Sequence, residues 1–81
     1  MDDRTIMYCL AFMVQELHIP CRVYKHTTSI VWYDIVFTYK DTEYWLTYSD
    51  AFPLTCKYLN NLLERQHEGQ NKRRDNAKNK A

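Results

Sequence analysis

Three residues in the first third of the chain have side chains that can bind a metal ion. His18, Cys21 and His26 follow the spacing H-x2-C-x4-H. A structural zinc site needs four ligands, and no fourth ligand stands nearby in the sequence. Since the spacing fits no standard zinc finger either, we expect no metal site and no cofactor.

The cysteines are also the candidate nucleophiles. A catalytic thiol needs a base within hydrogen-bond reach and a third group that orients the base. Cys9 is expected on the flank of a packed helix and Cys56 on the buried side of another, while Cys21 has only His18 near it in the sequence. Gly69 is the only glycine, so a glycine-rich phosphate loop is missing. We therefore expect no catalytic residues and no enzymatic activity.

The cysteine count also bears on the compartment. Three cysteines cannot all pair within one chain. The N-terminus opens with Asp2-Asp3 and not with the basic cluster that begins a secretory signal. Free, mostly buried thiols are typical of the reducing cytoplasm, where we expect the protein to act. The longest apolar run, residues 6–14, is far shorter than the ~20 residues of a membrane span, so we expect no membrane insertion.

Charge divides the 81-residue chain into two parts. Residues 1–68 carry six Lys and Arg against nine Asp and Glu, whereas residues 69–81 carry five against one. Apolar residues make up 46% of the chain, which is enough for a core, but alanine is the only one of them in the second part. We expect one globular domain over residues 1–68 and a disordered basic tail over residues 69–81.

Residues 3–18 are predicted to form a helix that is capped by Asp2 or Asp3 and ends before Pro20. At roughly 100° per residue, one side of this helix is apolar, and Tyr8 and Phe12 fall on the opposite side. The apolar side consists of Ile6, Leu10, Met13, Val14 and Leu17.

A second helix is predicted from a cap on Ser49 or Asp50 as far as Gly69, with Pro53 in its first turn. Its apolar side consists of Phe52, Cys56, Leu59 and Leu63. Each helix therefore has one side to bury.

Three strands are predicted between the helices, a short one over residues 21–26 and two longer ones within residues 30–48. In the longer pair, apolar and aromatic residues occupy alternate positions, which is the pattern of a strand with one buried face. These positions are Val31, Tyr33, Ile35, Phe37 and Tyr39, followed by Tyr44, Leu46 and Tyr48.

Burial of this face limits how the two longer strands can pair. A turn at Asp41-Thr42 and a loop over residues 40–43 both oppose Tyr39 to Tyr44, whereas a three-residue loop would oppose aromatic to polar side chains. Because Asp-Thr is not a preferred two-residue turn, we favour the longer loop.

The two apolar helix sides can both be covered if the helices pack on the same face of the sheet. The predicted fold is therefore an α+β two-layer sandwich, helix–three-stranded antiparallel sheet–helix (αβββα). The other sheet face is left uncovered, and it carries Trp32, Val36, Thr38 and Trp45. Two tryptophans on one uncovered face favour an interaction surface, because tryptophan is enriched at the hot spots of protein interfaces.

This element order resembles that of double-stranded RNA-binding domains over about residues 3–67. The resemblance implies RNA contacts from a Gly-Pro-x-His loop between the first two strands and from a lysine cluster that opens the second helix. Here the loop reads HTTS and the helix opens DAFPLTCK, so both elements are missing. A nucleic-acid-binding function would instead depend on base stacking by the uncovered aromatics and on the basic tail. The basic residues of the tail are Lys72, Arg73, Arg74, Lys78 and Lys80.

We expect a small protein-interaction module, an adaptor or an inhibitor, that binds a protein partner or a second copy of itself. The contacts are expected from the uncovered sheet face and from Tyr8 and Phe12. In size and character the chain resembles phage and mobile-element proteins that block host defence enzymes, such as anti-CRISPR and anti-restriction proteins. That resemblance implies a defence enzyme as the partner.

Overall fold

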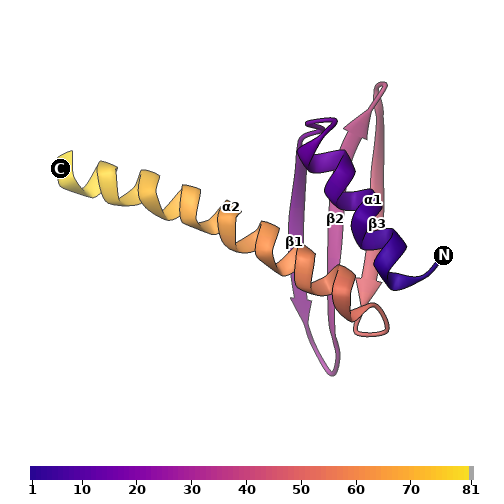
Figure 1. Cartoon of the computed structure of the whole chain (residues 1–81). Coiled ribbons are helices and arrows are strands. Elements are labelled where there is room, and N and C mark those ends of the chain that lie inside the picture. The colour runs from indigo at the N-terminus through magenta and orange to yellow at the C-terminus, as the bar shows by residue number, and fades with distance from the viewer. Residues whose placement is uncertain (81) are drawn as a thin grey trace.

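A computed structural model of the chain describes the backbone of residues 1–80 and the side chains of residues 1–67. The predicted disordered tail and its basic residues lie outside the side chains so described. The elements are α1 (Asp3–Gln15), β1 (Cys21–Thr27), β2 (Val31–Tyr39), β3 (Thr42–Ser49) and α2 (Pro53–Lys80). The strands form an antiparallel sheet in the order β1-β2-β3, and both helices lie on one face of it (Figure 1). The predicted αβββα fold is confirmed.

Helix α1 begins as predicted and ends three residues early. The Oδ1 atom of Asp2 caps it by accepting a hydrogen bond from the N–H of Thr5 at 2.8 Å. Beyond Gln15 the backbone turns away, because His18 adopts a left-handed conformation with φ 54°. Leu17 therefore leaves the apolar side of the helix and is 53% exposed, which corrects its predicted burial.

Helix α2 is capped from another helix. We expected Ser49 or Asp50 as the cap, but the carboxylate of Asp3 accepts hydrogen bonds from the N–H groups of Leu54 (2.7 Å) and Thr55 (2.9 Å). It also accepts a bond from the Thr55 hydroxyl at 2.7 Å. Partial burial acts to raise the pKa of the Asp3 carboxyl, but these hydrogen bonds outweigh it and hold the pKa below its ordinary value.

The hairpin between β2 and β3 closes more tightly than predicted. Lys40 and Asp41 have φ of 51° and 64°, and two left-handed residues in a two-residue turn match the twist of the flanking strands. Tyr39 therefore pairs with Thr42 and not with Tyr44, so the predicted register was wrong by two residues. A shift of two keeps every side chain on its predicted face.

The core lies between the sheet and the two helices. It consists of Leu10, Met13, Val23, Tyr33, Ile35, Leu59 and Leu63. Ile35 from the central strand and Leu59 from α2 are each 0% exposed, so they are the centre of this layer. The core residues of β1 and β2 have odd numbers, and on β3 the even-numbered Leu46 and Tyr48 pack against the core. The even-numbered residues of β1 and β2 and the odd-numbered residues of β3 therefore lie on the face without helices.

Candidate interaction surface

The open face is the side of the sheet opposite the helices. It is formed by Arg22, Tyr24 and His26 of β1, by Trp32, Asp34, Val36 and Thr38 of β2, and by Glu43, Trp45 and Thr47 of β3. The four sheet residues predicted to bind a partner are all on this face, and neither tryptophan is covered by a helix. The structure thus brings Trp32, Val36, Thr38 and Trp45 together as the alternation predicted.

Two aromatic rings dominate the middle of the open face. Tyr24 and Trp45 come from the two outer strands, and their rings lie 6.2 Å apart between centroids and only 9° from parallel. Val36 lies on the strand between them and is 3% exposed, although no helix covers it. Trp45 itself is 58% exposed. A partner on this face would meet the two rings before it reached Val36.

A second set of contacts crosses all three strands beside this pair. The ring of His26 stacks on Trp32 with centroids 5.0 Å apart and an angle of 16°. The Nε2 atom of His26 lies 2.8 Å from Oδ2 of Asp34, and Oδ1 of Asp34 accepts a hydrogen bond from the Thr47 hydroxyl at 2.6 Å. These contacts hold Trp32 in a half-buried position and fix the geometry of the face.

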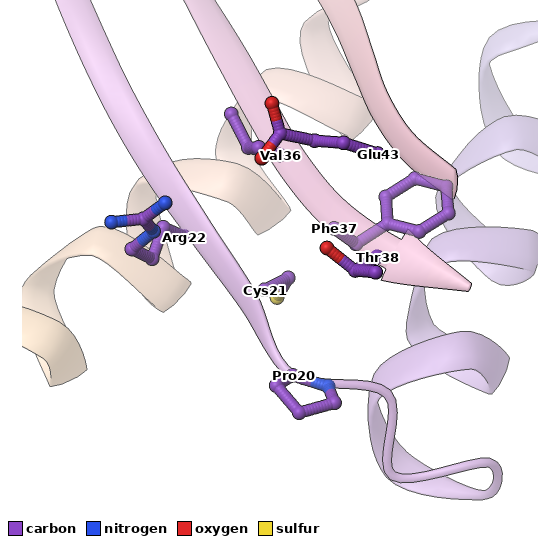
Figure 2. A pocket seen from close by; sticks show the side chains of 7 residues that line it. All are labelled: Pro20, Cys21, Arg22, Val36, Phe37, Thr38 and Glu43. Carbon is purple, nitrogen blue, oxygen red and sulfur yellow. The ribbon is translucent and has the colours of Figure 1, made fainter. Parts of the chain in front are cut away.

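A shallow cavity of about 260 Å³ opens at the end of the open face where β1 begins (Figure 2). It is lined by Pro20, Cys21, Arg22, Val36, Phe37, Thr38 and Glu43. Arg22 and Glu43 reach it from the two outer strands without forming an ion pair in the described part of the chain. Glu43 instead accepts a hydrogen bond from Nε1 of Trp45 at 2.7 Å, which orients the indole. Burial raises the pKa of the Cys21 thiol, so this thiol is not prepared to act as a nucleophile.

The other two predicted contact residues form a separate surface. Tyr8 and Phe12 are 61% and 56% exposed on the side of α1 that faces away from the core. Cys9, expected on the flank of a packed helix, is exposed as well, and Cys21 and Cys56 are only partly buried, so the expectation of mostly buried thiols was wrong. The structure does not join this surface to the open face, since the sheet and the helix layer lie between them.

The candidate metal ligands are not brought together. Cys21 packs against the core on the helix side of β1, whereas His26 lies on the open face and His18 lies in the loop after α1. In the described part of the chain, no three His, Cys, Asp or Glu side chains are grouped in a way that could hold a metal ion.

Sequence reasoning missed two residues of the open face, Tyr24 and His26. The signal was present in the alternation of residues 21–26, because Cys21 and Val23 share one parity and Tyr24 and His26 the other. Once Val23 is placed in the core, both rings must lie beside the tryptophans.

Among the described residues, no helix combines the length and apolarity needed to cross a membrane. The chain matches no protein-family model, no curated protein and no solved structure.

Proposed function

We propose that the chain is a non-enzymatic protein-interaction module, of the adaptor or inhibitor type, whose open face binds another protein molecule. The observation that carries this proposal is the 58% exposure of Trp45 beside Tyr24 on a face that no helix covers. Covering the exposed part of such an indole is worth roughly 3 kcal/mol from the apolar area removed from water. Because Tyr24 and Glu43 already orient Trp45, little side-chain freedom is lost on binding.

The charges of the open face favour a protein over a nucleic acid. Asp34 and Glu43 place two carboxylates there against the single guanidinium of Arg22. Lys25 lies on the helix side of the sheet, with its ammonium 5.9 Å from the centre of the Tyr33 ring. A nucleic-acid backbone needs a cationic groove, so binding of RNA or DNA would depend on the basic tail.

We also propose that the partner is an enzyme of a host defence system and that the protein acts in the cytoplasm. This part of the proposal rests on the size and character of the chain and on its unpaired cysteines. Expression of the chain in cells with an active CRISPR or restriction system should raise the plating efficiency of a targeted phage. Expression of a Trp45→Ala chain should not.

The test of the docking surface compares two exposed aromatics on different sides of the molecule. Immobilised wild-type chain, Trp45→Ala and Phe12→Ala are used to capture proteins from the host lysate, and the affinity of each captured protein is then measured by titration. Loss of a hot-spot side chain weakens binding by about 30-fold or more, which we expect for Trp45→Ala. A similar loss for Phe12→Ala would show that the surface of Tyr8 and Phe12 is a contact as well. A partner that both variants bind as tightly as the wild type would contradict the proposal.

A further inference from the structure

The two edges of the sheet differ, because Gln66 of α2 covers the β1 edge at Val23. Oε1 of Gln66 accepts a hydrogen bond from the N–H of Val23 at 3.2 Å, and Nε2 of Gln66 donates to the carbonyl of Val23 at 3.4 Å. The side-chain amide, presented by α2, thus bonds to Val23 as a neighbouring strand would. This is one of the ways in which proteins protect an edge strand from pairing with another chain.

The β3 edge has no such protection. Tyr39 and Thr42 flank the two-residue turn and are a hydrogen-bonded pair, so alternate residues of β3 bond to β2 and the others point outward. The outward residues are Glu43, Trp45, Thr47 and Ser49, and the carbonyl of Ser49 accepts hydrogen bonds from the N–H of Phe52 at 2.9 Å and from the thiol of Cys56 at 3.0 Å. Among the described residues, no other group hydrogen-bonds to the backbone N–H or C=O of Glu43, Trp45 or Thr47.

The side chains of β3 include few of the features that discourage pairing. The strand TEYWLTYS contains no proline, glycine or lysine, and Glu43 is its single charged residue. Trp45 is 58% exposed on the open face and Tyr44 is 41% exposed on the other, so both sides of the edge present aromatic surface. Pairing with a further strand would cover these rings and satisfy the free backbone groups at the same time.

We propose that β3 pairs antiparallel with β3 of a second copy of the chain, so that two three-stranded sheets become one continuous sheet with all the helices on the same side. This inference rests on the proposed function, because it takes a second copy of the chain to be the protein that binds at the open face and its β3 edge. The two copies are related by a two-fold axis perpendicular to the sheet.

Hydrogen bonding and charge select one register for this pairing. With Trp45 on the two-fold axis, it opposes Trp45 of the second copy, and Glu43 opposes Thr47. Glu43, Trp45 and Thr47 of each strand then find a partner, because outward residues face outward residues. No like charges are opposed, and Lys40 of each copy approaches Asp50 of the other at the two ends of the paired strands.

Proline substitutions test the pairing at each edge. Thr47→Pro removes an N–H that points away from the sheet and spares the ladder to β2. Thr47→Val is the matched control, because it loses the same hydroxyl and keeps the N–H, and Lys25→Pro removes an outward N–H from the β1 edge. Light scattering over a concentration series should give twice the 9.9 kDa chain mass for the wild type, Thr47→Val and Lys25→Pro, and the single mass for Thr47→Pro. Circular dichroism verifies that each variant is folded.

A cross-link tests the register. In chains with Cys9→Ser, Glu43→Cys in one copy and Thr47→Cys in the other place two thiols opposite each other at a Cα separation of about 5.5 Å, which is within the range of a disulfide. Oxidation of a mixture should therefore link Glu43→Cys chains to Thr47→Cys chains, whereas Glu43→Cys chains alone, which keep Trp45, should not link to each other. Links formed by Glu43→Cys alone would overturn the register.

The pairing and the proposed function can fail separately. A wild-type chain that is monomeric throughout the concentration series, or a Thr47→Pro chain that still dimerises, overturns the pairing. If a monomeric wild-type chain nevertheless binds another protein through Trp45, the proposed function stands without the dimer.

Discussion

The carboxylate of Asp3, in the first turn of α1, accepts a hydrogen bond from the buried N–H of Thr55 in the first turn of α2 at 2.9 Å. The hydroxyl of Thr55, a residue that is 0% exposed, donates to the same carboxylate oxygen at 2.7 Å. The two helices that cover the sheet are therefore joined at their N-termini, because the carboxylate of Asp3 in α1 caps α2. This contact fixes the helix layer that leaves the other sheet face open.

The Asp3 contact predicts an acid-sensitive step in stability. A carboxyl whose pKa is lowered in the folded protein stabilises the fold above its ordinary pKa of 3.8, and that stabilisation is lost as the pH falls through the folded value. Asp3→Asn should therefore melt at a lower temperature than the wild type at neutral pH, and the difference should shrink below pH 3.8. Thermal unfolding at several pH values measures this difference in melting temperature. Asp41→Asn, which changes a carboxyl in the hairpin turn, is the control. A difference that stays constant into strong acid would contradict the role of the carboxylate.

The core predicts a large difference between two leucines of α2. Leu59 is 0% exposed and Leu54 is 38% exposed. Leu59→Ala should lower the free energy of unfolding by about 2–5 kcal/mol, because it leaves a cavity in the centre of the core. Leu54→Ala should cost less than about 1 kcal/mol. Urea unfolding of both variants provides the measurement, and equal losses would mean that α2 packs through a different side.

Removal of the hydroxyl group should have different effects on stability at two tyrosines. The hydroxyl of Tyr33 donates to Oδ1 of Asn60 at 3.1 Å, whereas the buried hydroxyl of Tyr58 has no hydrogen-bond partner among the described residues. Tyr33→Phe should cost about 1 kcal/mol, and Tyr58→Phe should leave the free energy of unfolding unchanged or raise it by up to about 1 kcal/mol. A clear loss of stability in Tyr58→Phe would show that its hydroxyl is satisfied in solution.

The three thiols should react in a fixed order. Cys9 is exposed. Burial raises the pKa of Cys21, and burial together with the nearby Asp3 and Asp50 carboxylates raises that of Cys56. A raised pKa leaves less thiolate at mildly alkaline pH, so alkylation of Cys21 and Cys56 should be at least about tenfold slower than that of Cys9. Mass spectrometry after timed iodoacetamide treatment gives the order, and an early product at Cys21 would contradict the packing of β1.

The sequence was sufficient for the face on which each strand residue lies and insufficient for the contacts between elements. Alternation placed Trp45 and Trp32 on the uncovered side, because any even shift of register keeps the same face. The register itself depended on two left-handed residues, Lys40 and Asp41, and neither is glycine. A two-residue turn of this kind is difficult to recognise without glycine at either position.

The remaining differences are tertiary contacts. Asp3, which caps α2, is distant from that helix in the sequence. The local pattern around the start of α2 therefore indicated Ser49 or Asp50 and could not indicate Asp3. Val36 is 3% exposed on the strand between Tyr24 and Trp45, and the weak alternation of residues 21–26 did not assign Tyr24 to this face. The surface was thus predictable from alternation, while its internal arrangement was not.

The central claim is that Trp45 is a contact residue, and its accessibility in a complex tests this most directly. A Trp32→Phe chain reports on Trp45 alone, and a Trp45→Phe chain reports on Trp32 alone. Acrylamide quenching of each chain is measured when it is dilute and when it is associated with a partner or a second copy. We predict that the acrylamide quenching constant of Trp45 falls roughly several-fold on association, because burial of an exposed indole keeps the quencher away from it. The quenching constant of Trp32 should change little. Equal quenching of Trp45 in the free and associated states would contradict the account.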